Sequence, residues 1–375
     1  MSSTINYRLI PLSFTSTRPL IFIGNGNRNL GLRVAKHFPG CLCDIKIERF
    51  SDGEVRIPTI NENIRQRDCV IIQTVGITSK GSLNDMLVEL MVLIDTIKRA
   101  SCKSLTVVLP IYPYQRQDRK PCSRSPISAS MIAKVLKMQN VNRVICFDLH
   151  AGQIQGFFSY DTLLDNLYTE PYFINYIKNL NIPNNKLNNL NTVVSKLNQK
   201  TNLKRKRGAI IPYQETYRKL CMDELIIVSP DEGGVKRATR VAEKLGCNVA
   251  FMYKERCKVN QVSKMVLMGD VKDKICFIMD DMVDTAGTLC KAAEILKENG
   301  GVMIYAGACH GVLSGPAITR INESCIEKLI VSNTLEIEER FGKQDKIDVI
   351  DISELCASAI ERSLTGNSIS QLISL

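Results

Sequence analysis

The sequence reads Lys274-Ile-Cys-Phe-Ile-Met-Asp-Asp-Met-Val-Asp-Thr-Ala-Gly-Thr288 across the stretch that decides its fold. The apolar run from Ile275 to Met279 has the length and composition of a strand buried on both faces of a parallel sheet. We predict that this strand ends at the two carboxylates and that a helix covers residues 287–298. A functional site is therefore expected at the carboxyl end of the strand, where open α/β sheets bind ligands.

The turn after this strand has the groups of a phosphate site. Residues 284–288 offer successive backbone N–H groups, two hydroxyls and a glycine just before a helix N-terminus, which attracts anions. Asp280 and Asp281 suit two vicinal sugar hydroxyls, or a divalent cation that carries a phosphate. An ordinary βα turn is the alternative. The whole string Asp-Asp-x-x-Asp-Thr-x-Gly-Thr resembles the phosphoribosyl-binding loop of the type I phosphoribosyltransferase fold, which implies a phosphorylated pentose as ligand.

Composition limits the class of protein. The chain has 375 residues, enough for two domains, and 45% of them are hydrophobic. Its apolar runs are all shorter than the ~18 residues of a membrane span. Several of the 14 cysteines, such as Cys69, Cys146 and Cys276, lie in apolar runs, and C-x-x-C pairs do not occur. We interpret them as reduced core residues of an intracellular protein, which disfavours a disulfide frame or a zinc site.

The net charge of +11 is concentrated in one segment. Residues 181–223 contain nine Lys or Arg against two acidic residues, and eight Asn occur between 181 and 202. Such a polar segment cannot offset its ordering entropy by burial, so we predict an inserted, mostly disordered surface loop whose deletion leaves catalysis largely unchanged. Its run Lys204–Arg207 is interpreted as solvated charge, with a nuclear address or RNA contact as the alternative. The rest of the chain does not indicate a nucleic-acid-binding fold.

The remaining chain alternates between strand and helix patterns in two series. In the first series the predicted strands are 20–24, 45–50, 69–73, 105–110 and 144–147, and the predicted helices are 27–37, 83–100 and 128–138. In the second series they are strands 225–228, 249–252, 275–279, 302–306 and 328–331, and helices 235–245, 287–298 and 316–321. The pattern predicts two tandem α/β domains, each with a mostly parallel sheet flanked by helices.

Two segments of the first series place ligand-binding groups at predicted strand ends. Phe50 could stack on a purine while Asp52 and Glu54 accept hydrogen bonds from its amino group or ribose, although an ordinary turn is the alternative. The basic run after strand 105–110 suits a polyphosphate held by Arg116 with Gln117 nearby, or is simply a solvated surface.

Three more segments suggest metal binding and charge neutralisation. Asp148 and His150 would lie on one side of an extended segment and could share one cation, or could form a core His–Asp pair. Asp231 is a candidate metal ligand before a two-glycine turn. Lys254 and Arg256 precede a poorly anchored polar segment and suit closure over a transition state that gains negative charge, although such cations are usually solvated.

Together these segments resemble class I ribose-phosphate pyrophosphokinase, also called phosphoribosyl pyrophosphate synthetase, from about residue 20 to the end apart from the insertion. The matching motifs occur in the same order: F-S-D-G-E (50–54), Y-Q-R-Q-D (114–118), S-R-S-P-I-S (123–128), F-D-L-H-A-G-Q-I-Q-G-F-F (147–158), S-P-D-E-G-G (229–234), K-E-R (254–256), G-D-V-K-D (269–273) and D-D-M-V-D-T-A-G-T (280–288).

The resemblance implies transfer of the β,γ-diphosphoryl group of Mg-ATP to the C1 hydroxyl of ribose 5-phosphate, with release of AMP. It implies ATP binding by Phe50, Asp52, Glu54, Arg116 and Gln117; Mg²⁺ binding by His150 and Asp231 with Asp148 close by; binding of ribose 5-phosphate by Asp280, Asp281, Asp284, Thr285, Ala286, Gly287 and Thr288; and closure of Lys254 and Arg256 on the transferring group. A catalytically silent subunit of the family and a phosphoribosyltransferase are the alternatives.

It also implies two type I phosphoribosyltransferase-like domains, with the ATP-binding domain at 19–166 and the ribose-5-phosphate-binding domain at 167–361. Residues 1–18 are expected to be a disordered extension, with a targeting segment as the alternative, and residues 362–375 to contribute to a regulatory site. A cytoplasmic hexamer built from dimers, activated by inorganic phosphate and inhibited by ADP, is implied, without membrane or nucleic-acid partners.

The regulatory site would lie between subunits and would include Arg65, Arg124, Gln155, Asp165, Ser368 and Ser370. The chain departs from the animal pattern at Asn63, at Pro121, and at Ser159 with two added residues before Asp165. These departures leave the catalytic residues intact but put the strength of phosphate and ADP control in doubt.

Overall fold

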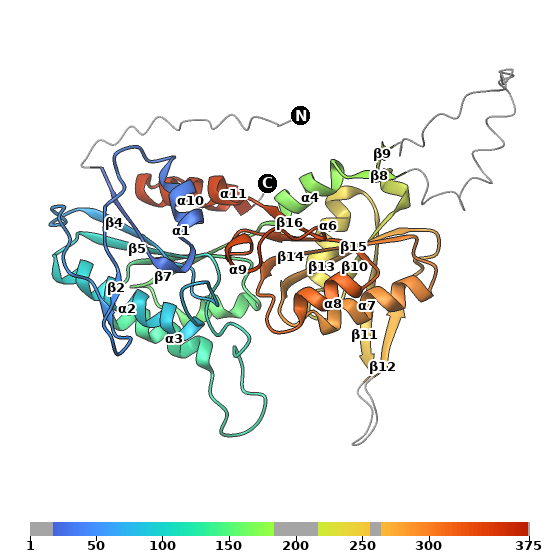
Figure 1. The fold of residues 1–375 in the computed structure, drawn as a ribbon, viewed down its shortest axis with the longest axis horizontal. Coiled ribbons are helices and arrows are strands. Elements are labelled where there is room, and N and C mark those ends of the chain that lie inside the picture. Colours follow the sequence, from blue (N-terminus) through green and yellow to red (C-terminus); the bar gives the residue numbers. More distant parts are fainter. Residues whose placement is uncertain (1–17, 184–216, 256–263, 374–375) are drawn as a thin grey trace, which may run out of the picture.

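The computed structural model describes residues 18–183, 217–255 and 264–373, which form two sheets lying side by side (Figure 1). The first sheet is parallel throughout, in the order β1-β4-β5-β6-β7. Its strands are β1 (Leu20–Ile23), β4 (Asp68–Ile72), β5 (Ser104–Leu109), β6 (Arg143–Phe147) and β7 (Leu163–Leu167). The predicted α/β class with parallel-dominated sheets is confirmed.

The second sheet has the order β12-β11-β10-β13-β14-β15-β16 and is parallel except for β12, which is antiparallel to β11. Its strands are β10 (Leu225–Ser229), β11 (Asn248–Glu255), β12 (Lys264–Met268), β13 (Ile275–Val283), β14 (Met303–Gly311), β15 (Ile326–Ser332) and β16 (Ile347–Ile350). Its central strands β10, β13 and β14 are buried or largely buried on both faces, as expected where helices cover both sides.

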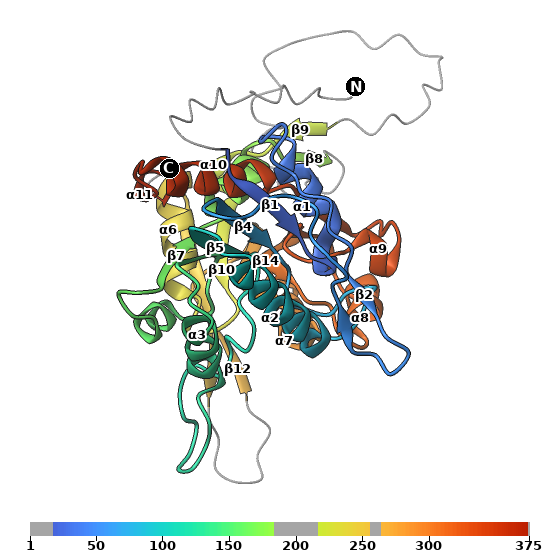
Figure 2. The ribbon, with the colours of Figure 1, turned by 90° about the vertical axis from the view of Figure 1, so that its left-hand side faces the viewer.

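Helices cover both faces of each sheet (Figures 1 and 2). On the first sheet, α2 (Leu83–Arg99) and α3 (Ser128–Met138) pack on one face, and α1 (Arg28–Ala35) and α10 (Ser353–Thr365) on the other. On the second sheet, α4 (Glu170–Lys178) and α6 (Val235–Leu245) pack on one face, and α7 (Gly287–Glu298) and α8 (Ala317–Glu323) on the other. The predicted helices 128–138, 235–245 and 287–298 have the observed bounds.

The end of the chain returns to the first sheet. Buried Ile352, Leu355 and Ile360, in and beside α10, share a core with Ile21 of β1 and Val34 of α1, and the short helix α11 (Ser370–Ile373) follows on the same side. The predicted end of the second domain, residue 361, falls within α10. This helix comes from the far end of the chain but packs in the core of the first sheet.

Several predicted strand bounds are wrong, among them 302–306, which is observed as β14 (Met303–Gly311), and 249–252, which is observed as β11 (Asn248–Glu255). Of 45–50, only β2 (Glu48–Arg49) is a strand, and it pairs antiparallel with β3 (Val55–Arg56) in a hairpin outside the large sheets. Ile45 is buried in the core without belonging to a strand, so the alternation of apolar and polar residues over 45–50 does not indicate a strand there. Strand β13 does not stop at Met279 but runs on to Val283, because β14 continues the parallel ladder beside it.

The edges of the predicted surface loop also need correction. Asn181–Pro183 (β8) pairs antiparallel with Tyr217–Lys219 (β9), and the side chains of Ile182 and Leu220 are buried in the core under α4 and α6. Residues 184–216, which contain most of the Asn and Lys, lie outside the described part of the chain. The segment 181–223 therefore contains a packed hairpin at its ends.

Two deletions should separate the hairpin from the rest of the segment. Joining Pro183 to Tyr217 by a short turn keeps both strands, and we expect a folded protein with a melting temperature close to that of the full chain. Removing 181–223 takes Ile182 and Leu220 out of the core, and we expect a loss of several kcal/mol at about 2 to 5 kcal/mol per large buried side chain. Thermal unfolding followed by circular dichroism measures both. Equal stability of the two deletions would contradict a structural role for the hairpin.

The molecule has two halves, the first sheet with its helices and the second sheet with its helices. The loop after β15 connects them. The Asn27 side chain donates to the Asn333 carbonyl oxygen, Thr74 Oγ1 donates to the Thr334 carbonyl oxygen, and both the amide and the hydroxyl of Ser79 donate to Glu336. Because these bonds fix loops of the first sheet against the second, the carboxyl ends of the two sheets are held toward each other.

The helices in the described part of the chain are all too short or too polar to span a lipid bilayer.

Candidate active site

A cavity of about 380 Å³ opens where the carboxyl ends of the two sheets meet. The first half contributes the loops after β4 and β5, including Arg116 and Gln117. The second half contributes residues at and beyond the ends of β13, β14 and β15, including Asp284 and Ser314. Arg116 donates to Asp284 Oδ2 at 2.7 Å, across the cavity wall. Arg116 and Gln117, predicted to bind a nucleotide, and Asp284, predicted to bind a pentose phosphate, thus line one cavity.

The backbone around this cavity adopts conformations that side chains usually avoid. Tyr114, Asp148, Ala286 and Leu313 all have positive φ, between 40° and 59°. Each follows the carboxyl end of a strand of one of the two sheets. Strained backbone of this kind costs of order 1–3 kcal/mol per residue and is frequent at functional sites, but five further non-glycine residues with positive φ, Asn140 and Asp273 among them, lie elsewhere in the described chain.

His150 and Asp281 form a contact between the two halves. His150 Nδ1 lies 2.7 Å from Asp281 Oδ2, and the backbone N–H of His150 donates to Gln115 Oε1. An ionised carboxylate only accepts hydrogen bonds, so Nδ1 carries a proton and the neutral ring keeps its lone pair on Nε2. The side chain is 40% exposed. In the neutral ring Nε2 can therefore bind a cation, whereas donation from Nε2 to a phosphate requires the protonated ring.

The charges here are set by close neighbours. The hydrogen bond to Asp281 raises the pKa of His150 in spite of its partial burial. Burial alone would raise the pKa of Asp281, but the hydrogen bond from His150 and the charge of Arg237 outweigh it and lower that pKa. Burial beside the ionised Asp281 raises the pKa of Asp280 well above its usual value. The two adjacent carboxyl groups therefore differ in charge and surroundings.

Asp280 and Asp281 also face opposite sides of the sheet, because β13 continues through them. Asp281 is 6% exposed and lies on the α6 side, where it meets Arg237. Asp280 is half-buried and accepts from the Asp281 amide at 2.8 Å. Treating them as two equivalent carboxylates at a strand end was therefore an oversimplification.

Asp148 does not share one side of an extended segment with His150. Its φ of 40° ends the extended chain, and its buried carboxylate accepts hydrogen bonds from the amide and hydroxyl of Thr169. Its Oδ1 has no hydrogen-bond partner among the described residues. Asp148 thus has an anchoring position behind the site, with one acceptor atom remaining.

Asp231 lies in the turn between β10 and α6. Its Oδ1 accepts from the Gly234 amide at 3.0 Å, and its charge contributes to the raised pKa of Asp280. A Cβ at Gly234 would lie 2.7 Å from Ser229 Oγ, which explains the glycine at the helix start. No three metal-binding side chains of the described residues form a complete cation site by themselves.

The predicted phosphate loop leads into α7. Ala286, in the left-handed conformation, is its N-cap, and Thr285 and Thr288 are exposed. Arg320 of α8, which the sequence analysis did not identify, donates from its guanidinium to the Thr285 carbonyl oxygen at 2.9 Å. The loop thus offers open hydroxyls and a helix N-terminus, with a cation beside it.

The remaining predicted nucleotide residues are not in this cavity. Phe50, Asp52 and Glu54 form the tip of the β2–β3 hairpin, where Phe50 is 50% exposed beneath the Arg56 guanidinium and Asp52 Oδ1 accepts from the Glu54 amide. Gly53, with φ of 94°, makes the tight turn. The structure describes a preformed exposed tip and does not bring it together with Arg116.

The two predicted catalytic cations can be placed only in part. The Lys254 backbone belongs to β11, paired with Met265 of β12. Its side chain, and the whole of Arg256, lie outside the described part of the chain.

The predicted regulatory residues are spread over the first half. Arg65, Arg124 and Gln155 are exposed, while Asp165 pairs with Arg143 within the first sheet. Arg124 precedes α3, whereas Ser368 precedes α11 and Ser370 begins it, on the opposite face of that sheet. Within one chain these residues do not form a single site.

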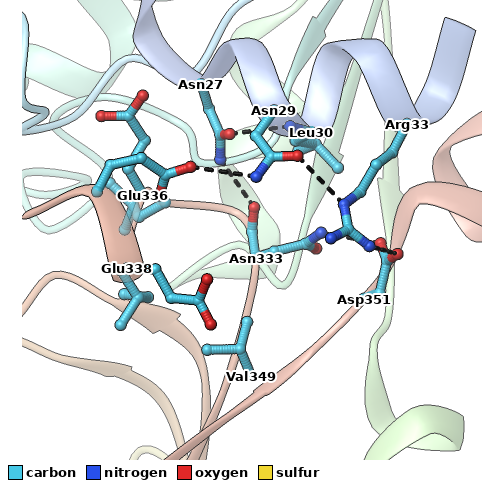
Figure 3. Close-up of a pocket in the computed structure, with 12 residues that line it drawn as sticks. Asn27, Asn29, Leu30, Arg33, Asn333, Glu336, Glu338, Val349 and Asp351 are labelled. Carbon is cyan, nitrogen blue, oxygen red and sulfur yellow. Dashed lines mark hydrogen bonds and ion pairs between the residues drawn. The ribbon is translucent and has the colours of Figure 1, made fainter. Parts of the chain in front are cut away.

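A second, smaller cavity of about 150 Å³ lies between α1 and the segment after β15 (Figure 3). Its polar groups already bind one another: Arg33 pairs with Asp351 at 2.9 Å, and Asn333 also donates to Asp351. None of the predicted site residues lines it. We interpret it as part of the contact between the two halves.

Three family models match the sequence. Residues 19–139 match the N-terminal domain of ribose phosphate pyrophosphokinase, residues 199–311 a phosphoribosyl transferase domain, and residues 256–374 a phosphoribosyl synthetase-associated domain.

Proteins of similar length share much of the sequence. Ribose-phosphate pyrophosphokinase 2 of Schizosaccharomyces pombe is 40% identical over 95% of this chain and 97% of its own. Ribose-phosphate pyrophosphokinase 3 of Saccharomyces cerevisiae is 42% identical over 92% of this chain and 94% of its own. The crystal structure of phosphoribosylpyrophosphate synthetase from Mycobacterium smegmatis, at 30% identity, covers 94% of this chain and all of its own with a TM-score of 0.75.

Proposed function

The chain belongs to the ribose-phosphate pyrophosphokinase family, and from this premise we propose that it is a catalytically active member that makes 5-phospho-α-D-ribose 1-diphosphate and AMP from Mg-ATP and ribose 5-phosphate. The observation that carries the proposal is the shared cavity, in which Arg116 from the first sheet and Asp284 from the second sheet meet at 2.7 Å. Binding ATP, the diphosphoryl donor, and ribose 5-phosphate, the acceptor, in one cavity suits direct transfer between the two substrates.

On the pentose side, the exposed Thr285 and Thr288 hydroxyls and the start of α7 would hold the 5-phosphate, with Asp284, Ala286 and Gly287 completing the loop. Asp280 and Asp281 would accept from the ribose hydroxyls. The carboxylates keep the sugar oriented while the helix N-terminus neutralises the phosphate, so the C1 hydroxyl is presented toward the first domain.

On the nucleotide side, Arg116 and Gln117 would bind ATP, and Phe50, Asp52 and Glu54 would contact its adenosine when the hairpin tip reaches it. Diphosphoryl transfer requires mainly alignment of the attacking oxygen with the β-phosphorus and neutralisation of spreading negative charge. Lys254 and Arg256 are proposed to supply that neutralisation as AMP leaves.

The residues around the cavity fit a magnesium ion that is carried by the nucleotide. His150 keeps Nε2 open, Asp231 has a half-buried carboxylate, and the buried Asp148 keeps one oxygen without a hydrogen-bond partner among the described residues. Mg²⁺ commonly takes one or two protein ligands and completes its shell with phosphate oxygens and water. When bound, it would neutralise charge on the phosphates of ATP.

A catalytically silent member of the family would be expected to have lost these groups, whereas Lys254, Arg256, His150 and Asp231 are all present in the sequence. A phosphoribosyltransferase would share residues 280–288 but would have no use for Arg116 in a second domain.

Regulation by phosphate and ADP at a site between subunits of a hexamer is also proposed, because Arg124 and Ser368 lie on opposite faces of one chain's first sheet.

We expect the purified protein to release AMP from ATP only when ribose 5-phosphate and Mg²⁺ are both present, and EDTA to abolish the release. Coupled assay of AMP, with omission of each substrate as control, measures this. Activity that requires a nucleobase in place of ATP would support the transferase, and no AMP release under any condition would support the silent subunit. The same assay over a range of phosphate and ADP concentrations tests the proposed regulation.

A further inference from the structure

Arg237 is a buried cation behind the active site that no sequence motif identified. Its side chain is 12% exposed, and a guanidinium nitrogen lies 3.7 Å from Asp281 Oδ1. It comes from the first turn of α6, and it meets Asp281 because both lie on the α4–α6 side of β13. Its Nε has no hydrogen-bond partner among the described residues.

The charges around Arg237 explain why a buried cation is tolerated. Burial opposes its charge, yet the carboxylates of Asp148, Asp281 and Asp280 raise its pKa. All three were assigned to the active site from sequence. Arg237 is thus a counter-ion shared by acidic groups of the proposed substrate and metal sites.

Asp281 connects this cation to the other half of the protein. One carboxylate oxygen faces Arg237, and the other lies 2.7 Å from His150 Nδ1. These contacts are continuous: Arg237 of α6 faces Asp281 of β13, and Asp281 contacts His150 in the segment after β6. Removing an outer hydrogen-bond partner of a metal ligand typically costs 10- to 100-fold in metal affinity or activity, and we expect an effect of that order for the partner of a substrate-binding carboxylate.

We propose that Arg237 is a positioning residue that holds the Asp281 side chain in place, and that through Asp281 it fixes both the pentose site and His150. The inference rests on the proposed function, since it assumes that Asp281 contacts ribose 5-phosphate. Arg237 itself stays behind the carboxylates and does not touch the substrate.

Arg240 provides a matched control on the same helix. It lies one turn after Arg237, pairs with the buried Glu170 at 3.1 and 3.2 Å, and stacks 5.2 Å from the Tyr168 ring centroid. It therefore also neutralises a buried carboxylate, but one outside the proposed substrate site. Arg240→Met should lower stability without changing ribose 5-phosphate affinity.

The experiment compares Arg237→Met, Arg237→Lys and Arg240→Met with the unmodified full-length protein. Titration calorimetry with ribose 5-phosphate in the absence of nucleotide gives Kd, and steady-state assays give KM for each substrate and kcat. We expect Arg237→Met to raise both Kd and KM for ribose 5-phosphate about tenfold or more, with KM for ATP changing less than about threefold. Arg237→Lys, which keeps the charge, should recover much of the affinity.

A purely structural role would give a different result, because partial unfolding lowers the active fraction and apparent kcat but leaves the KM of folded molecules unchanged. If Arg237→Met is folded and its Kd and KM for ribose 5-phosphate stay within twofold, the inference is wrong. If Arg237→Met does not fold, Arg237→Lys decides, since unchanged Kd and KM in that variant would equally contradict the inference. If the unmodified protein neither binds ribose 5-phosphate nor releases AMP, the proposed function fails and the inference fails with it.

Discussion

Lys254→Ala is expected to lower kcat about 100- to 1,000-fold, which corresponds to roughly 3 to 4 kcal/mol of transition-state stabilisation. The physical reason is that the diphosphoryl group gains charge on its equatorial oxygens during transfer, and in the proposed mechanism the Lys254 cation stabilises that charge. The substrates are bound by other groups in the proposal, so KM for ribose 5-phosphate should change much less than kcat.

Lys244→Ala is the control for this experiment. Lys244 is exposed in the last turn of α6, at the end of the helix away from the cavity. Its replacement should leave kcat within about twofold. Single-turnover measurement of AMP release at saturating substrates separates chemistry from product release. A Lys254→Ala protein as fast as its parent would remove this residue from the proposed mechanism.

Gly26→Ala is expected to destabilise the first domain by about 3 kcal/mol, which should lower the melting temperature by roughly 10 °C. A Cβ at this position would lie 2.0 Å from the Thr74 carbonyl oxygen, a separation that requires backbone movement. Gly26 belongs to the loop after β1 (Asn25–Asn27), and its amide donates to Gln73 Oε1 at 3.0 Å. The added methyl should therefore push apart two loops at the carboxyl end of the first sheet.

Gly156→Ala offers a comparison with the same chemical change. A Cβ there meets nothing within 4 Å, and Gly156 lies in a 3-10 helix (Gly152–Phe157). We expect this variant to be neutral or slightly stabilised, because alanine restricts the unfolded chain. Differential scanning calorimetry of both variants provides the measurement. Equal melting temperatures would show that the loop after β1 yields more easily than its packing indicates.

Much of the candidate site follows from the sequence, because its groups come directly after strands. Arg116, His150, Asp231 and residues 284–288 all come just after apolar runs, and carboxyl ends of parallel strands gather at one edge of a sheet. Arg237 was missed because it lies within a helix whose sequence reads as an ordinary amphipathic surface helix. Basic residues are common on such faces, so its burial had no local signal.

The sequence by itself determined the alternation of strands and helices and the loops that carry the polar groups, because periodicity and turn chemistry are local properties of the chain. Only the tertiary structure decided which groups meet. Arg116 and Asp284 are 168 residues apart, and His150 and Asp281 are 131 apart. The extension of β13 through both carboxylates and the return of α10 to the first sheet also depend on partners distant in the chain, since ladders and cores form only when those partners pack together.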